Sequence, residues 1–394
     1  MEYKPLGSMV KRKISYGIVQ PGRSVPNGIP VIKVNNLISG LNSPSELDTT
    51  ARQNETKYAR TRLHGGELII SVVGTIGKTA IIPESFAGCN LVRATALIDI
   101  EDTLLTKWVK YYIESPNGQS YIEKNLNTTV QPTLNIKSLV EMPIPLFEAT
   151  TIEKIVLFLS SLDEKIKVNK RINDNLERQA QAIYHERFET VSPNDFPSDW
   201  RIVTLGEVAM ISNKSFNPLK KPEILLEHYS IPAFDEARFP VFELSTSIKS
   251  NKFIIDASCF MISKLNPTTK RVWKPYCLTE NAVCSTEFIV YKAKDESITD
   301  FLYSVIDSSS FSDFMRSHVT GSTGSRQRTT PSDTLSYELI LPSEDELAEF
   351  QSLVSPIYAQ IRINAIENDK LKRLRDSLLP KLMSGEIDVS AVQF

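Results

Sequence analysis

The feature that most constrains the fold is one stripe of side chains that occurs twice, 195 residues apart. In both copies apolar and asparagine side chains follow one another at alternating spacings of three and four residues. Such spacing is typical of a helix that packs along another helix. The stripe comprises Leu159, Leu162, Ile166, Asn169, Asn173, Leu176, Ala180 and Ile183, and again Val354, Ile357, Ile361, Asn364, Asn368, Leu371, Arg375 and Leu378. The sequence therefore predicts two long, related helices.

Asparagine occupies matching positions of the two stripes, at Asn169 and Asn173 and at Asn364 and Asn368. A single stripe would more simply mark a helix that packs on its own domain. Buried asparagine costs stability, however, and its best-attested use is to fix the register of paired helices. We therefore expect the two helices to pack on each other with these asparagines setting their register. Because a whole domain separates the two helices in the sequence, the chain can pair them more easily in an antiparallel than in a parallel orientation.

The segments that precede the helices repeat more faintly. Leu6-Gly7 resembles Leu205-Gly206, whereas the interiors of the halves share no sequence and carry short β-branched runs typical of strands. A constant frame with divergent interiors is expected of two domains with different targets. The predicted fold is α+β, with two globular, strand-rich α/β domains joined by two long antiparallel coiled-coil helices in a pseudo-two-fold repeat. The boundaries are a first domain over 1–147, a central helix over 148–189, a linker over 190–199, a second domain over 200–342, and a C-terminal helix and tail over 343–394.

Composition limits the functional classes. A chain of 394 residues suits several domains, and no apolar run is long enough to cross a membrane. The four cysteines form no CxxC pair, which argues against zinc and against a disulfide framework, so we expect a cytoplasmic protein. The net charge of -2 counts against a free-standing DNA-binding protein, unless the basic residues lie on one face or partner subunits share the contact.

Sequence motifs for catalysis are missing. The segment Gly74–Lys78 is reminiscent of a phosphate-binding loop, but Val72 stands where that loop needs its first glycine. A glycine-rich hairpin that leaves Lys78 exposed is the better prediction. The four histidines show no cluster spacing, and the motifs of hydrolases, zinc deaminases and base methyltransferases are absent. We therefore expect no catalytic residue, no metal and no cofactor in this chain.

Loops suited to nucleic acid remain. Residues 318–330 combine glycines for close approach, hydroxyls for phosphate, and arginine and glutamine for base edges, and residues 125–133 occupy the same place in the first half. Basic residues interleaved with Trp273 and Tyr276 indicate a second patch. For the loops the alternative is a flexible polar loop, but their matching positions favour a binding role. For the basic–aromatic patch, a solvated hairpin is an equal alternative. The candidate DNA-binding residues are Lys78, Arg93, Thr129, Gln131, Lys264, Arg271, Lys274, Ser325, Arg326, Gln327 and Arg328.

Four segments, in this order and with the duplication, resemble the specificity subunit of type I restriction–modification enzymes. They are residues 68–78, 88–93, 324–328 and 378–387. The resemblance covers nearly the whole chain and implies a non-catalytic subunit for defence against foreign DNA. Each domain would be a target-recognition domain that reads one half of a split site in the major groove of double-stranded DNA.

The resemblance also implies partner subunits that bind the cofactors. Two methyltransferase subunits would dock on the helices and use S-adenosylmethionine to methylate adenine, and translocase–nuclease subunits, which need ATP and magnesium, would complete the restriction complex. One alternative is a specificity chain that serves a methyltransferase–nuclease fusion, as in some type IIB systems. Another is a coiled-coil scaffold without a DNA role, which the near-neutral charge favours.

Overall fold

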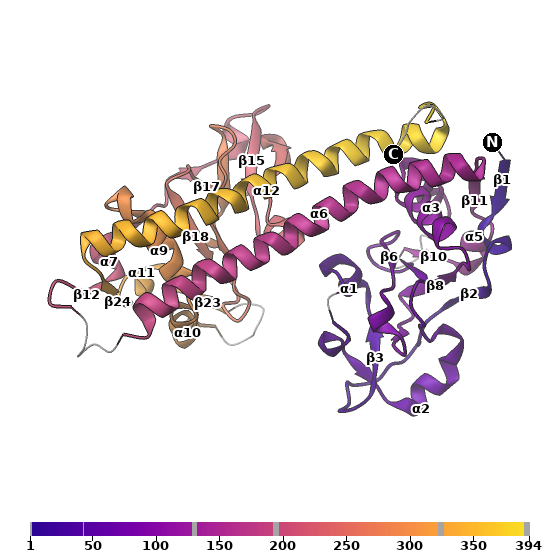
Figure 1. Ribbon diagram of the computed structural model, residues 1–394, viewed down its shortest axis with the longest axis horizontal. Helices are drawn as coiled ribbons and strands as arrows, with labels where there is room; N and C mark the ends of the chain where they lie inside the picture. The colour runs from indigo at the N-terminus through magenta and orange to yellow at the C-terminus, as the bar shows by residue number, and fades with distance from the viewer. Residues whose placement is uncertain (1, 42, 128–131, 192–196, 322–326, 390–394) are drawn as a thin grey trace. The chain divides into compact units, whose positions relative to one another are not determined.

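The protein is described by a computed structural model that covers residues 2–41, 43–127, 132–191, 197–321 and 327–389. It has two compact units, residues 1–165 with 370–394 and residues 166–369. Two long helices, α6 (Ala149–Tyr184) and α12 (Glu344–Ser384), each contribute one end to each unit (Figure 1). The predicted fold class, two mixed α/β domains with two long helices, is confirmed. Across the described ranges, no helix is long and apolar enough to cross a membrane.

The first unit is built on a four-stranded antiparallel sheet with the order β2-β8-β5-β6. These strands are β2 (Arg12–Tyr16), β8 (Thr95–Asp99), β5 (Leu68–Ser71) and β6 (Thr79–Ile81). A smaller sheet has the order β4-β3-β7, in which β3 and β7 are parallel. Its strands are β4 (Thr49–Thr50), β3 (Ile29–Ile32) and β7 (Asn90–Leu91).

The second unit repeats this plan although the sequences of the interiors differ. Its four-stranded sheet has the order β13-β21-β18-β19, formed by β13 (Ala209–Ile211), β21 (Phe288–Ala293), β18 (Cys259–Ser263) and β19 (Val272–Trp273). A second sheet, β14-β17-β20-β15-β16, again contains a parallel pair, β15 with β20. Its strands are β14 (Ser215–Phe216), β17 (Lys252–Ile254), β20 (Ala282–Ser285), β15 (Leu225–Tyr229) and β16 (Val241–Leu244). The two domains therefore share a topology that their sequences do not reveal.

The remaining elements also correspond in the two units. A strand pair precedes each long helix: β1 (Glu2–Pro5) with β11 (Pro143–Leu146), and β12 (Arg201–Thr204) with β24 (Glu338–Leu341). Each unit also has a short hairpin: β9 (Leu126–Asn127) with β10 (Thr133–Leu134), and β22 (Val319–Thr320) with β23 (Arg328–Thr329). The short helices of the first unit are α1 (Val34–Ser39), α2 (Arg52–Glu55), α3 (Thr103–Glu114), α4 (Pro116–Lys124) and α5 (Ile136–Val140). Those of the second unit are α7 (Leu205–Val208), α8 (Ile231–Ala237), α9 (Thr299–Ile306), α10 (Ser309–Ser317) and α11 (Pro331–Thr334).

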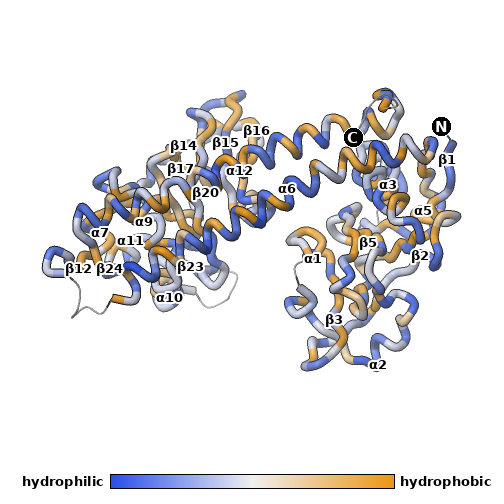
Figure 2. The backbone as a smooth tube through the Cα atoms, in the orientation of Figure 1, coloured by the Kyte–Doolittle hydropathy of each residue, from blue (hydrophilic) through white to orange (hydrophobic). Residues whose placement is uncertain are grey.

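Each core is closed by both long helices, along which hydrophobic and hydrophilic residues alternate (Figure 2). In the first unit, Ile152 and Ile155 near the start of α6 share a core with Leu379 and Leu382 near the end of α12. In the second unit, the start of α12 and the end of α6 do the same, and a π-helical turn (His185–Glu189) extends α6. Burial of these apolar side chains from two helices is what attaches the helices to the domains.

The asparagines of the stripe pair between the helices, as the sequence predicts. The Asn169 side-chain amide donates to Asn368 Oδ1 at 3.0 Å, and the Asn364 amide donates to Asn173 Oδ1 at 2.8 Å. The two hydrogen bonds are equivalents of each other under the 195-residue repeat. The earlier asparagine of one helix pairs with the later asparagine of the other, so the helices are antiparallel. Asn169 and Asn364 are only 1% and 5% exposed, so their polar groups are satisfied inside the seam.

Replacing Asn169 by alanine is expected to lower the free energy of unfolding by about 1–3 kcal/mol, because the Glu367 carboxylate and Asn368 Oδ1 both lose the buried amide that donates to them. The repeat predicts a similar loss for Asn364→Ala. Urea unfolding of both variants measures these losses, with exposed Lys170→Ala on the same helix as the control. If Asn169→Ala lost no more stability than Lys170→Ala, the asparagine pairs would not hold the register of the helices.

One site of the stripe is apolar in the first copy and charged in the second. Arg375, which stands where the first copy has Ala180, donates to Asp163 Oδ1 at 2.7 Å within the first unit. Tyr111 Oη also donates to Asp163, at 2.9 Å. In the second unit Ala180 and Tyr358 lie in the apolar core instead. The two ends of the helix pair are therefore chemically distinct, although their backbones repeat.

Candidate nucleic-acid interface

The glycine-rich segment of the first domain is a hairpin loop. It connects antiparallel strands β5 and β6, and the Ser71 amide closes it by donating to the Lys78 carbonyl at 2.8 Å. A strand follows the loop, whereas a phosphate-binding loop is followed by a helix. Lys78 is exposed. The predicted hairpin with an exposed lysine is confirmed.

Three segments of the first domain meet at this end of the sheet. The Val72 amide donates to the Ala94 carbonyl at 2.8 Å, which joins the β5–β6 loop to the turn that carries exposed Arg93. The Leu134 amide donates to the Val72 carbonyl at 2.9 Å, which joins the same loop to the β9–β10 hairpin. The loop, the turn and the hairpin form what we call the first edge. Two predicted residues, Lys78 and Arg93, belong to it.

The second domain has the same three-segment edge. Here the Ser263 amide donates to the Arg271 carbonyl at 2.9 Å, and the Lys264 amide donates to the Glu287 carbonyl at 2.9 Å. The Thr329 amide donates to the Lys264 carbonyl at 3.1 Å, which joins the β18–β19 loop to the β22–β23 hairpin. The loop, the turn at Glu287 and this hairpin form the second edge. It contains the predicted residues Lys264, Arg271, Gln327 and Arg328.

The two loops also turn in the same way. Gly74 has φ of 79° and Asn266 has φ of 51°, and each is followed by residues that lead back into the sheet. Glycine tolerates this left-handed conformation freely, and asparagine is among the residues that adopt it most readily. The strand pairs β9–β10 and β22–β23, which lie in the segments 125–133 and 318–330, are structural counterparts, as the sequence predicts. Thr129, Gln131, Ser325 and Arg326 lie outside the described residues.

Carboxylates hold the two described arginines of the second edge. Arg271 Nε and Nη2 donate to the two carboxylate oxygens of Asp235 in α8 at 2.6 and 2.9 Å. Arg328 donates in the same manner to Glu287, and this pair raises the pKa of the Arg328 guanidinium. These acids could not be identified from the sequence, because Asp235 lies 36 residues from Arg271 and Glu287 lies 41 residues from Arg328, with no local signal. Both arginines are therefore fixed in orientation before any ligand binds.

The predicted basic–aromatic patch is largely part of the core. Trp273 and Tyr276 are buried, and half-buried Lys274 is in contact with buried Asp300 and lies over the Tyr358 ring. Burial lowers the pKa of Lys274 to about 8. Trp273 belongs to β19, and Lys274, which directly follows the strand, is engaged within the domain by Asp300 and Tyr358.

Lys274→Ala is therefore expected to destabilise the fold by about 3 kcal/mol, because Asp300 would keep a buried charge without its cation. The double variant Lys274→Ala/Asp300→Ala should recover part of this loss. Thermal unfolding checks both, with exposed Lys249→Ala as the control. An unchanged melting temperature together with weakened DNA binding would instead assign Lys274 to the interface.

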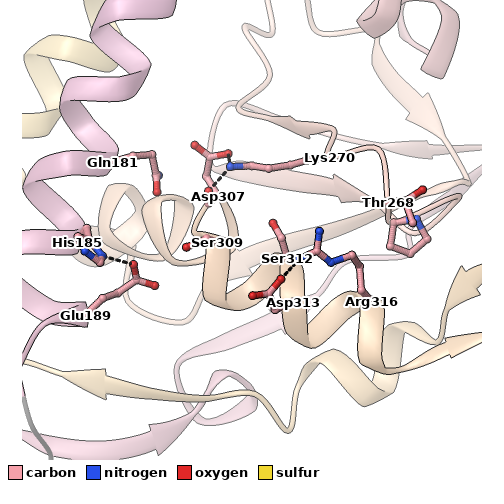
Figure 3. Close-up of a pocket in the computed structure, with 11 residues that line it drawn as sticks. Gln181, His185, Glu189, Thr268, Lys270, Asp307, Ser309, Ser312, Asp313 and Arg316 are labelled. Atoms are coloured by element: carbon pink, nitrogen blue, oxygen red, sulfur yellow. Dashed lines mark hydrogen bonds and ion pairs between the residues drawn. The ribbon is translucent and has the colours of Figure 1, made fainter. Parts of the chain in front are cut away.

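A polar pocket of about 460 Å³ adjoins the β18–β19 loop (Figure 3). Each basic side chain that lines it is paired with an acid: His185 with Glu189 at 2.9 Å, Lys270 with Asp307 at 2.6 Å, and Arg316 with Asp313. Burial raises the pKa of Asp307. In the part of the chain that the structure describes, no cluster of acids, cysteines and histidines could hold a metal ion. The basic side chains of the pocket are thus all engaged by acids of the same domain.

Comparisons with known proteins agree with this architecture. A family model described as a type I restriction modification DNA specificity domain matches residues 16–178. The chain is 26% identical over 196 residues to the type I restriction enzyme EcoBI specificity subunit of Escherichia coli, and 23% identical over 329 residues to the MjaIX specificity subunit of Methanocaldococcus jannaschii. Residues 16–178 belong to the family of type I restriction–modification DNA specificity domains.

The fold of the chain is similar to a crystal structure of the type I restriction–modification S subunit from M. genitalium. The TM-score is 0.54 at 14% identity, over 96% of this chain and 95% of that one. The sequence matches are partial: they cover 48% and 73% of this chain, and 40% and 71% of the Escherichia coli and Methanocaldococcus jannaschii subunits. The first edge lies within the range that the family model matches.

Proposed function

We propose that this specificity subunit reads a split DNA target, with the first edge at one half-site and the second edge at the other. The observation that carries the proposal is the repeat of one three-segment edge in both domains with different side chains. Where Lys78 and Arg93 lie in the first domain, Arg271 and Thr286 lie in the second. An identical frame that presents different donors and acceptors would recognise two different base sequences.

The charge of the chain favours shared binding with partner subunits. The net charge is -2, and Arg271 and Arg328 of the second edge are partly neutralised by carboxylates. Much of the affinity of a DNA-binding protein comes from neutralised phosphates. We therefore infer that the subunit alone binds DNA weakly and that partners supply most of the phosphate contacts. The chain itself would perform no chemistry. S-Adenosylmethionine would bind to methyltransferase subunits, and ATP and magnesium to restriction subunits, in the cytoplasm.

We infer that methyltransferase subunits dock on the long helices at two equivalent places. Val168 of α6 and Ile363 of α12 are equivalents under the 195-residue repeat, and both are exposed, at 38% and 55%. Each directly precedes a buried asparagine of the seam. Exposed apolar side chains at repeated positions favour one partner at each, and hence two methyltransferase subunits.

Charged substitutions test this docking. Val168→Asp and Ile363→Asp are each expected to remove one methyltransferase subunit from the co-purified complex, as measured by native mass spectrometry, because a buried unpaired carboxylate is costly. Gln179→Asp adds the same charge at another exposed site of α6 and should leave the stoichiometry unchanged. Retention of both subunits by both apolar-site variants would place the docking elsewhere.

Binding of the co-purified complex to a randomised duplex library tests the proposed function itself. Enrichment of one split motif, lost when the chain is omitted, is the expected result. A complex that assembles but selects no motif would instead support the scaffold alternative, and a partner that carries both methyltransferase and nuclease domains would support the fusion system.

A further inference from the structure

Hydrogen bonds attach the β5–β6 loop of the first edge to the junction of helices α3 and α4. Thr79, the first residue of β6, donates from Oγ1 to Glu114 Oε1 at 2.6 Å. Lys110, one turn earlier in α3, donates to the other oxygen of Glu114 at 2.8 Å. Gln119 Nε2 in α4 donates to the Gly77 carbonyl of the loop at 3.4 Å. The junction therefore holds the end of the loop that leads into β6.

Helix α3 is in turn bridged to the long helix α6. Tyr111, three residues before Glu114, donates from Oη to Asp163 Oδ2 in α6 at 2.9 Å. Tyr111 is buried and Asp163 is half-buried. Two side-chain hydrogen bonds and one turn of α3 thus connect the loop to α6. We call the pairs Thr79–Glu114 and Tyr111–Asp163 the first anchor.

The loop of the second edge is attached at the same place of its own domain. Lys270 of the β18–β19 loop is paired with Asp307 Oδ1 at 2.6 Å and also donates to the Asp307 carbonyl (Figure 3). Asp307 directly precedes Ser308, which caps α10, just as Glu114 directly precedes Ser115, which caps α4. An acid at the end of the short helix therefore holds the loop in both domains.

The bridge to the long helix also recurs, with the lengths of the two side chains exchanged. Ser304, three residues before Asp307, is hydrogen-bonded to Tyr358 Oη of α12 at 2.7 Å. Tyr358 is the equivalent of Asp163 under the 195-residue repeat. A tyrosine on α3 therefore meets a short acid on α6, and a serine on α9 meets a tyrosine on α12. We call the pairs Lys270–Asp307 and Ser304–Tyr358 the second anchor.

Direct contact with DNA does not account for the two acids. A carboxylate close to a DNA-binding edge repels phosphates, so Glu114 and Asp307 would weaken binding unless they serve another purpose. The interiors of the domains share no sequence, yet both contain an anchor of the same form. Side chains of a loop can discriminate between bases only when the residues around the loop hold its backbone in place.

We propose that Glu114 and Asp307 are positioning residues, each of which holds the loop of its own edge and so determines how sharply one half-site is read. Neither acid contacts DNA on this account, and Lys270 serves the loop rather than a phosphate. The inference rests on the proposed DNA-reading function and adds the residues that act on the reading loops from behind.

The test of the first anchor uses the complex with its methyltransferase subunits. Its ligands are duplexes that carry the selected motif, or the motif with single base-pair changes in one half-site. Thr79→Val keeps the size of the side chain but loses the hydroxyl. It should reduce discrimination at the first half-site roughly 3- to 10-fold and leave the second half-site unchanged. Thr79→Ser keeps the hydroxyl and should behave as the wild type.

The second anchor provides the reciprocal experiment. Lys270→Met removes the ammonium group and keeps most of the length of the side chain. A loss of similar size is expected at the second half-site alone, so each variant is the matched control for the other. Thermal unfolding establishes that both variants are folded.

The outcomes separate the anchors from the proposed function. A wild-type complex that selects no motif would contradict the proposed function. With a selected motif, unchanged discrimination in folded Thr79→Val and Lys270→Met would overturn the positioning role, and so would a loss at both half-sites from either variant. Uniform weakening of Lys270→Met on all sequences, with a shallower salt dependence, would instead place Lys270 at a phosphate.

Discussion

Exchange of residues 1–147 for those of another specificity subunit is expected to replace one half of the methylated target completely and leave the other half unchanged. The segments that build the first edge, residues 72–78, the turn at Arg93 and the β9–β10 hairpin, all lie within the exchanged range. The core of the first unit also contains Leu379 and Leu382 of α12, so the exchanged domain must keep apolar partners for them.

Sequencing of methylated adenines in cells that carry the chimera and the methyltransferase gene measures this result. The reciprocal exchange of residues 200–342 serves as the matched control and should alter only the other half-site. If either exchange changed both halves, the two edges would read DNA jointly, and the independence of the domains would be wrong.

The largest effect on stability is expected for Phe350→Ala. The ring of this fully buried residue at the start of α12 lies 5.2 Å from that of Phe188 and 6.0 Å from that of Phe301, between centroids. It therefore connects both long helices to the second domain. Loss of the ring and the resulting cavity should lower the free energy of unfolding by about 3–5 kcal/mol.

Urea unfolding followed by tryptophan fluorescence checks this value. Leu353→Ala changes an exposed residue on the same helix and should shift stability by no more than about 0.5 kcal/mol. Equal losses for the two variants would mean that the aromatic cluster does not anchor the helices.

The long helices and the seam asparagines could be predicted because their signal is periodic and occurs twice. Asn169 pairs with Asn368 and Asn364 pairs with Asn173, since burial in a seam leaves an amide few other partners. The shared topology of the interiors could not be predicted. Equivalent positions carry Val72 and Lys264, or Gly74 and Asn266, and backbone hydrogen bonds fix these positions without regard to the side chain.

The candidate site was predictable in its location but not in its detail. The hairpins and the exposed Lys78 follow from local turn chemistry. The partners of the arginines, Asp235 and Glu287, come from remote segments that only the folded sheet brings close. The burial of Trp273 was missed because a two-residue strand is too short to show an alternating pattern.

The most direct test of the central claim, that this chain supplies sequence specificity to a methyltransferase, is adenine methylation mapped across a genome. Host cells would express the methyltransferase subunit with and without this chain. We expect methylation at a single split motif only when both are present. Methylation of the same motif without the chain, or no motif when both subunits are present and assembled, would contradict the claim.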